Sequence, residues 1–472
     1  MNSISPRLRA WMPLAVCTYG ILVACAFGFV FYRRQGLLDP AINLNAFGTI
    51  ARHIAHGDGF SQGHGPTIRR APLYPYMGGA LLAILGRDAP GISQLELYWP
   101  IIAANCIIFG ATCVVVWRLA ARIFGPRTGL LAAVACPWFP QSLRYVGMTE
   151  VETLMGLCVA LLAATGLALA TRPGARTGAA FGAVAAAATL AKPIVLFYPF
   201  VFIACAVWHW KSAAARPLAA LAGTGAALLC FGVLLAPWSL RNMAVSGGAF
   251  KGISSNGPGE SLRGYVNAQP KYYLLRQDFG GNGPGEKWDP EANAYEEKLL
   301  KPYGIPFYWA IRETDGTYET APPHPAVSDA ILEVQKDEAE SAEVKRQVVS
   351  HPAAFVRKFI VQLFTFWYVV ETRKKSLLVG GISAVVLALS ALGVVRARRH
   401  QEVVWPIVAV VVYFNAMYAV FLAFARYSMP LFPTLAILAA GGTAALAERL
   451  IPRRKRSSAS DAVPARGNHV RA

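Results

Sequence analysis

Residues 217–242 read PLAALAGTGAALLCFGVLLAPWSLRN, a long apolar stretch that ends in a cation and an amide. About 20 consecutive apolar residues are enough to cross the hydrocarbon core of a bilayer as a helix. The final segment, Pro237 to Asn242, would then lie where the membrane meets water. Charged and amide groups at that depth usually serve a polar ligand. The stretch therefore predicts a membrane helix whose outer end contributes to a binding site.

Composition places the whole chain in the same class. Of the 472 residues, 55% are hydrophobic and only 15% are charged, whereas a soluble globular chain carries about 25% charged residues. The net charge is +19, and many of the cationic residues lie in short clusters between apolar runs. This pattern is typical of membrane topology and not of nucleic-acid binding. All eight cysteines lie inside apolar runs, so we expect no disulfide and no cysteine-bound metal. We expect an all-α polytopic membrane protein.

The apolar runs predict about ten spanning helices. The first run has no small-residue cleavage site behind it, so we interpret it as an uncleaved span and not as a signal peptide. Cations near 118–127, 172–176, 211–216, 396–399 and 453–456 fall on one side if both termini are cytoplasmic, as the positive-inside rule requires. We expect a multi-pass membrane protein with its functional face outside. The predicted spans are 11–32, 98–121, 128–146, 151–171, 177–191, 194–210, 217–238, 376–395, 403–424 and 427–449.

Two cation clusters, Arg33-Arg34 and 373–375, break this rule and would face the exterior. Making 353–371 a further span would put Arg357 and Lys358 inside the bilayer. We therefore interpret 351–371 as an amphipathic helix on the outer membrane surface, with the aromatic side chains of 364–368 at the headgroup level.

This topology divides the chain into four parts. Residues 1–238 form a transmembrane module that includes a first external loop, 33–97, with amphipathic juxtamembrane segments. Residues 239–375 form a large external region, rich in Gly, Pro and acids, with a short helix near 325–349. Residues 376–452 return as transmembrane helices, and 453–472 form a basic cytoplasmic tail. Function is expected on the external face.

Cations and acids on that face are the candidates for chemistry. Arg70, Lys192 and Arg241 are predicted to converge there, which favours phosphate contacts over lysines or arginines that merely extend to the interface. Glu150 and Glu152 begin a predicted span, where the helix dipole alone would favour acids. His53 and His56 have a helix-compatible metal spacing without a visible third ligand, so no metal site is expected.

Six short segments, taken in order against the hydropathy, resemble a known family. The chain is similar to the membrane-embedded C-type glycosyltransferases that use polyprenyl-phosphate sugars, in particular the bacterial family related to protein O-mannosyltransferases and to the lipid A aminoarabinose and galacturonic acid transferases. The segments are 51–61 (ARHIAHGDGFS), 71–75 (APLYP), 149–154 (TEVETL), 191–193 (AKP), 237–242 (PWSLRN) and 426–430 (RYSMP).

The resemblance implies roles for particular residues. The family places a catalytic Asp, which acts as general base, at the position of Asn43, and an amide cannot take up a proton at neutral pH. Asp39 lies one helical turn earlier and is the candidate replacement. Arg70 matches the family's contact to the donor phosphate. Lys192, Arg241 and, less closely, Arg426 resemble its further lipid-phosphate ligands.

The reaction implied by the resemblance is displacement at the anomeric carbon of a polyprenyl-phosphate sugar by an acceptor in the envelope, which is a protein, lipid A or a glycan. The partners implied are the lipid-linked donor, the acceptor and the bilayer. No cofactor is expected, and a divalent cation is permitted by the family without being indicated by the residues. Sugar and acceptor identity are not encoded in any of the six segments.

Three other interpretations keep the same cations. A carrier-lipid binding or transport protein would need polar groups in mid-span, and the predicted spans hold few. A catalytically inactive member would bind the donor without transfer because of Asn43. An envelope polysaccharide polymerase would not be expected to combine the PWSLRN and AKP segments.

Overall fold

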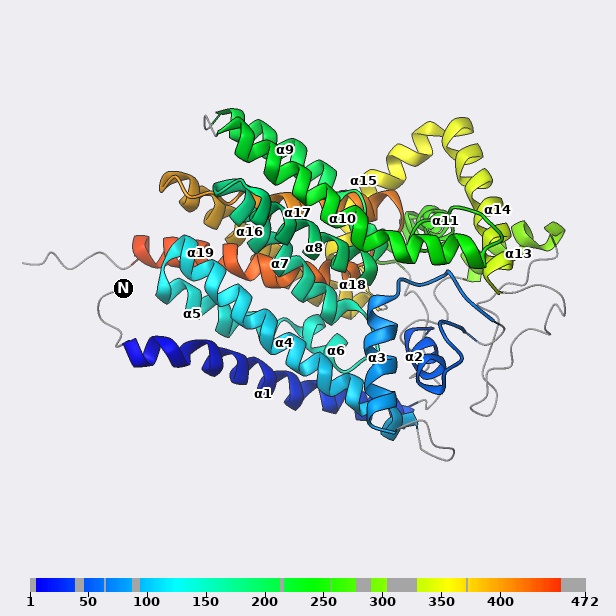
Figure 1. Cartoon of the computed structure of the whole chain (residues 1–472), viewed down its shortest axis with the longest axis horizontal. Helices are drawn as coiled ribbons and strands as arrows, with labels where there is room; N and C mark the ends of the chain where they lie inside the picture. Colours follow the sequence, from blue (N-terminus) through cyan, green and yellow to red (C-terminus); the bar gives the residue numbers. More distant parts are fainter. Residues whose placement is uncertain are drawn as a thin grey trace, which may run out of the picture.

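The computed structural model describes residues 6–38, 46–62, 65–86, 94–212, 216–255, 257–276, 290–303, 329–370 and 372–450. These residues are helical or irregular, and their one β-type pairing is an isolated bridge between Ser61 and Pro66. The predicted all-α class is confirmed (Figure 1).

Seven helical segments in this part of the chain are long and apolar enough to cross a membrane, so the protein is polytopic. They correspond to α1 (Pro6–Leu38), α4 (Gln94–Phe124), α7 (Glu152–Thr171), α9 (Tyr198–Ser212), α10 (Pro217–Val245), α16 (Arg373–Arg399) and α19 (Phe432–Leu450). The segment with α9 begins at Pro193, and the segment with α19 begins at Ala425.

The remaining apolar helices are shorter. Helices α8 (Ala175–Ala191) and α17 (Trp405–Val420) have 17 and 16 residues, and they match two of the ten predicted spans. The predicted span 128–146 is not one helix: it is α5 (Pro126–Ala135), a 3₁₀ turn at Cys136–Trp138 and α6 (Pro140–Val146). Pro137 and Pro140 explain the break, because proline supplies no N–H and its ring clashes with the preceding helical turn.

Close helix pairs are built on small residues. Where α8 crosses α10, a Cβ atom on Gly178 or Gly182 would collide with backbone atoms of Gly223 or Ala227. Where α16 crosses α19, a Cβ atom on Gly393 would do the same at Leu438. Small residues let helix backbones approach in a membrane, where van der Waals packing replaces the hydrophobic effect between helices.

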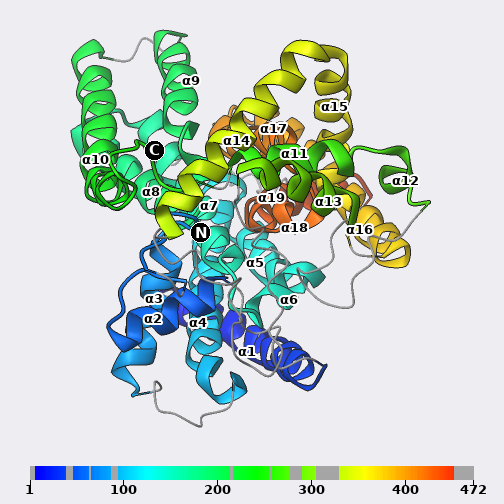
Figure 2. The same ribbon diagram turned by 90° about the vertical axis from the view of Figure 1, so that its right-hand side faces the viewer.

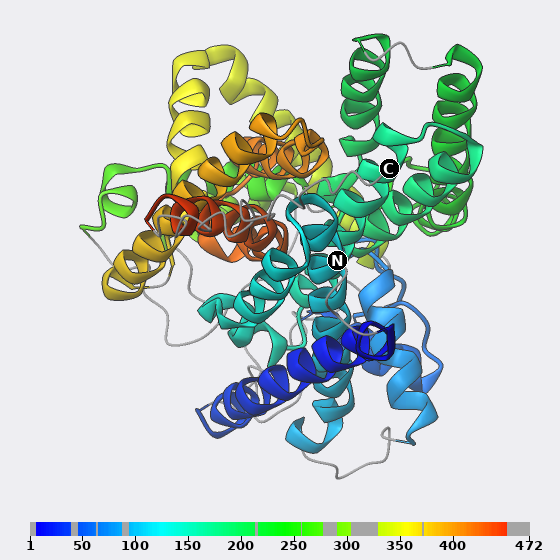
Figure 3. The same ribbon diagram turned by 90° about the vertical axis from the view of Figure 1, so that its left-hand side faces the viewer.

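The two ends of the bundle differ in character. At one end, Arg122 on α4 donates to Thr171 on α7, and Arg396 on α16 pairs with Glu448 on α19. This end is seen in Figure 3 and lies at the left of Figure 1. The other end, seen in Figure 2, carries α2, α3, α11, α13 and α14. The bounds of the remaining helices are α2 Ala46–His56, α3 Leu73–Ile84, α11 Gly257–Asn267, α12 Pro270–Tyr273, α13 Pro290–Leu300, α14 Asp329–Ser350, α15 Pro352–Tyr368 and α18 Ala425–Ser428, with 3₁₀ turns at Pro193–Val195, Lys301–Tyr303 and Met429–Leu431.

The predicted helix near 351–371 exists as α15, but two of its polar side chains face inward. Lys358 and Gln362 are buried, whereas Val356, Ile360 and Phe364 are exposed on the other side. Phe366, predicted at the headgroup level, is fully buried. The reason is that Lys358 and Gln362 find backbone acceptors on neighbouring elements, so the apolar stripe is what remains to face the surroundings.

Candidate functional site

The C-terminal end of α10 gathers two loops. Trp238 donates its indole N–H to the carbonyl of Ile253 at 3.0 Å, and Asn242 donates to the carbonyls of Gly252 and Ile253 at 3.0 and 3.1 Å. Asn242 is fully buried. A buried amide needs such partners, because an unsatisfied polar group costs about 1–3 kcal/mol. The PWSLRN segment therefore anchors Gly252 and Ile253, in the loop after α10, against this helix.

Arg241 reaches in a different direction, toward the loop before α3. Its Nη1 donates to the carbonyl of Thr67 at 2.6 Å, and its Nη2 donates to that of Phe60 at 3.2 Å. The guanidinium also lies over the rings of Phe60 and Trp238, with its carbon 5.4 and 4.8 Å from their centroids. In this structure Arg241 thus holds the loop that leads to Arg70.

Arg70 lies at the end of that loop, just before α3. Its guanidinium lies over the Phe47 ring of α2, with its carbon 5.4 Å from the centroid. Its Nε is buried and has no hydrogen-bond partner among the described residues. Burial lowers the pKa of Arg70 to about 10, a shift that the charges of Glu260 and Glu150 oppose. Arg70 is therefore cationic at neutral pH, with an unused donor inside the molecule.

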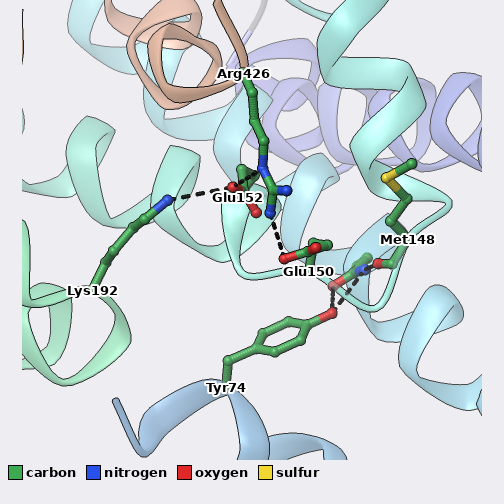
Figure 4. Close-up of polar contacts among 7 residues, drawn as sticks. Tyr74, Met148, Glu150, Glu152, Lys192 and Arg426 are labelled. Carbon is green, nitrogen blue, oxygen red and sulfur yellow. Dashed lines mark hydrogen bonds and ion pairs between the residues drawn. The ribbon is translucent and has the colours of Figure 1, made fainter. Parts of the chain in front are cut away.

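A cluster of opposite charges lies where α7, α8 and α18 meet (Figure 4). Arg426 donates from one terminal guanidinium nitrogen, Nη2, to Glu150 Oε2 at 2.6 Å, and from Nε to Glu152 Oε1 at 2.7 Å. Lys192 reaches the same Glu152 oxygen at 3.3 Å. The Glu152 side chain is 0% exposed. Two of the predicted phosphate-binding cations are thus held together by two acids.

Aromatic rings line the cation side of this charge cluster. The rings of Tyr418 and Tyr427 stack with centroids 4.6 Å apart. The Lys192 ammonium lies 4.7 Å from the Tyr427 centroid, and the Arg426 guanidinium carbon lies 5.3 Å from that of Tyr145. Cation–π contacts of this kind hold a cation without neutralising it. The second oxygen of Glu152, Oε2, is buried and has no hydrogen-bond partner in the described part of the chain.

Hydrogen bonds from one buried amide hold the turn that presents Glu150. Asn105, in the middle of α4, donates its amide to the carbonyls of Val146 and Met148 at 3.2 and 2.9 Å. Its amide also hydrogen-bonds the hydroxyl of Tyr74 on α3, which is the tyrosine of the APLYP segment (Figure 4). The motif around Tyr74 and the turn before α7 are thereby tied to one buried amide.

Electrostatics join Arg70 to the charge cluster. Burial raises the pKa of Glu150 above its ordinary value, while the charges of Arg426, Arg70 and Lys192 act against that rise. Glu150 thus lies in the field of all three cations. Such a carboxylate, with a shifted pKa and several positive neighbours, is typical of a site that binds or processes a charged ligand.

The structure brings Lys192 and Arg426 together at Glu152, and the charge of Arg70 acts on Glu150 of the same cluster, while the contacts of Arg241 lie on the neighbouring loop. Asp39 and Asn43 lie outside the described residues. His53 pairs with Asp58 at 2.9 Å, and among the described residues no three His, Cys, Asp or Glu side chains form a group that could hold a metal ion.

Sequence reasoning passed over three acids. It explained Glu150 and Glu152 by the helix dipole, although both contact Arg426. It did not single out Glu333, which contacts the loop before Arg70 from 265 positions away. Nothing local in an acidic stretch of α14 marks one carboxylate as different from its neighbours.

One part of the chain matches the model of a known protein family. Residues 70–236 match the family model described as dolichyl-phosphate-mannose-protein mannosyltransferase. No curated protein sequence matches the chain.

Two solved structures are similar at low scores. The archaeal oligosaccharyltransferase AglB from Archaeoglobus fulgidus, in complex with an inhibitory peptide and a dolichol-phosphate, is 14% identical with a TM-score of 0.44, and the match covers 94% of this chain and 51% of that one. ArnT from Cupriavidus metallidurans bound to undecaprenyl phosphate is 14% identical with a TM-score of 0.34, covering 90% and 77%. The chain thus spans about half the length of the AglB structure. The family match covers Arg70, Glu150, Glu152 and Lys192, and over residues 70–236 the chain is similar to that family, as its sequence motifs also indicate.

Proposed function

We propose that this protein transfers a sugar from a polyprenyl-phosphate donor to an acceptor in the cell envelope, at the external face of the membrane. The observation that carries the proposal is the pairing of Lys192 and Arg426 with Glu150 and Glu152 at one end of the bundle, where the charge of Arg70 also acts on Glu150. The match of residues 70–236 to a family named for dolichyl-phosphate-mannose supports a lipid-linked donor.

The chemistry assigns work to these charges. A hydroxyl oxygen of the acceptor attacks the anomeric carbon, and the bond from that carbon to the phosphate oxygen breaks with its electron pair remaining on the phosphate. The leaving polyprenyl phosphate gains negative charge, which Arg70 stabilises because a guanidinium keeps its own charge and matches phosphate oxygens in geometry. The configuration at the sugar inverts. The acceptor proton passes to Asp39, the predicted base.

The acids of the charge cluster keep its cations in place before the donor binds. Arg426 is fixed by Glu150 and Glu152, and Lys192 is fixed by Glu152 and the Tyr427 ring. Cations held in advance need no reorganisation when the charge on the phosphate grows, which is how a prepared polar site stabilises a transition state.

Transfer of labelled sugar tests the proposal. Purified protein in nanodiscs is given a panel of polyprenyl-phosphate sugars and crude envelope acceptor, and wild type is compared with Arg70→Ala, Asp39→Asn and the control Arg399→Ala. Arg399 is an exposed arginine at the C-terminal end of α16. We expect label in one acceptor fraction, a loss of about 100-fold in Arg70→Ala, and full activity in Arg399→Ala.

The same assay separates the competing functions. Binding of donor that depends on Arg70, without transfer from any donor, would support a carrier-lipid binding protein or an inactive member. Asn43→Asp then decides between them: a gain in turnover identifies an enzyme weakened at its base position, and no gain directs attention to Asp39 or to the binding role.

A further inference from the structure

One peptide group in the loop before Arg70 is held from both sides. The carbonyl of Thr67 accepts from Arg241 on α10 at 2.6 Å. The N–H of Ile68, which belongs to the same planar peptide unit, donates to Glu333 Oε2 on α14 at 2.7 Å. Because the peptide unit is rigid, two charged partners on opposite edges fix its orientation.

The neighbouring groups of this loop are fixed as well. The Thr67 hydroxyl donates to Glu333 Oε1 at 2.5 Å and accepts from the N–H of Arg69 at 3.2 Å. The Ile68 carbonyl accepts from the N–H of Ser255 at 3.1 Å. Both peptide groups between Thr67 and Arg69 are thus hydrogen-bonded.

These contacts are buried. Thr67 and Ile68 are 0% exposed, and Glu333 is 4% exposed. Hydrogen bonds to an ionised carboxylate are stronger than neutral ones, and they strengthen further away from water. Ile68 also packs against Ala330 and Val334 of α14, so the helix that carries Glu333 docks directly on the loop.

We propose that Glu333 is a positioning residue for the donor phosphate: with Arg241 it clamps the Thr67–Ile68 peptide and so holds the Arg70 guanidinium in place. The inference rests on the proposed function, in which Arg70 contacts the phosphate. Arg241 then acts through the loop, and the external helix α14 becomes part of the donor site without touching the donor.

Binding of undecaprenyl phosphate to the full chain in nanodiscs tests this directly. Glu333→Gln keeps the size of the side chain, but its amide nitrogen must face the Thr67 hydroxyl or the Ile68 N–H, both of which donate to the carboxylate. We expect binding about 10-fold weaker, the usual effect of losing a charged hydrogen bond. The control is Glu338→Gln, because Glu338 lies on the same helix with its side chain 65% exposed.

A double-mutant cycle separates positioning from general stability. If Glu333 acts through Arg70, adding Glu333→Gln to Arg70→Ala weakens binding less than about 2-fold further, whereas independent effects would multiply. Full multiplication, or unchanged binding in Glu333→Gln alone, overturns the inference while the proposed function stands.

Hydrogen exchange of the peptide covering 60–70 provides a readout that needs no ligand. Glu333→Gln is expected to speed exchange at Ile68 and Arg69, and Glu338→Gln is not. If wild type binds no undecaprenyl phosphate, the proposed function and the positioning role both fail. If binding is normal and exchange at 67–69 is unchanged in Glu333→Gln, only the clamp fails.

Discussion

Glu152 shows how one residue can organise a site. Its carboxylate is fully buried and contacts both Arg426 and Lys192. Taking a carboxylate out of water costs several kcal/mol, which only paired charges and hydrogen bonds offset. Lys192 in turn relies on this acid, because among the described residues no other acid lies within ion-pair distance of its ammonium.

Glu152→Gln is therefore expected to destabilise the protein by about 3 kcal/mol, the scale for removing one partner of a buried ion pair. Glu448→Gln is the control, since Glu448 also pairs with an arginine, Arg396, but its side chain is 61% exposed. Its loss is expected to cost about 0–1 kcal/mol. Thermal unfolding in detergent measures both, and equal effects would contradict this account.

At the scale of elements, α15 is held by a lysine with neutral partners. Lys358 is 1% exposed, and its ammonium donates to the carbonyl and hydroxyl of Ser261 on α11 and to the carbonyl of Val420, the last residue of α17. The rings of Tyr265 and Phe355 lie nearby. One side chain thus joins α15, α11 and the end of α17.

Lys358 predicts a pH dependence of stability. Burial lowers its pKa from 10.5 to about 7, so between these values the unfolded chain binds one more proton than the folded chain. Stability contributed by this group therefore rises from about pH 7 toward pH 10 and is flat below 7. Thermal unfolding from pH 6 to 10 should show this rise in stability in the wild type. The control Arg357→Met, which changes the exposed neighbour of Lys358, should show the same rise. A rise of the same size in Lys358→Met would refute the assignment.

The close contact between α8 and α10 leads to a second prediction at this scale. A Cβ atom at Gly182 on α8 would collide with the carbonyl of Ala227 on α10. A Cβ atom at Gly225, also on α10, would have no other atom within 4 Å. We expect Gly182→Ala to cost about 1–3 kcal/mol through overpacking. Gly225→Ala should be neutral or slightly stabilising. Thermal unfolding compares the two, and a stable Gly182→Ala would mean that the helices separate freely.

The whole molecule has two unlike ends. Cation clusters gather at one end, and the site with α11 and α14 lies at the other (Figures 1 and 2). The positive-inside rule predicts that the cation end is cytoplasmic.

Labelling with a membrane-impermeant maleimide tests this orientation. Cysteine in place of Glu338, exposed on α14, should react in intact spheroplasts, whereas cysteine in place of Arg398, exposed at the cation end, should react only after lysis. The unchanged chain measures the background from its own cysteines. The reverse pattern would place the site in the cytoplasm and remove external-face transfer from the proposal.

Local signals explain what was predictable. Apolar runs determine spanning helices because each must satisfy its backbone internally in lipid, so most spans, α15 and α14 were anticipated to within a few residues. The 128–146 span was missed because hydropathy averaged over Pro137 and Pro140. Topology alone predicted that Arg70, Lys192 and Arg241 share a face, and the family resemblance added Arg426.

By itself the sequence determined the class, the number of crossings to within a few, the family resemblance and the face on which the cations gather, because these depend on composition and on short segments. Only the tertiary structure decided which charges touch. Arg426 meets Glu152 across 274 positions, and Glu333 meets Ile68 across 265. Partners at such separations are set by how helices pack, and no local pattern encodes which of several acids will be buried beside a given cation.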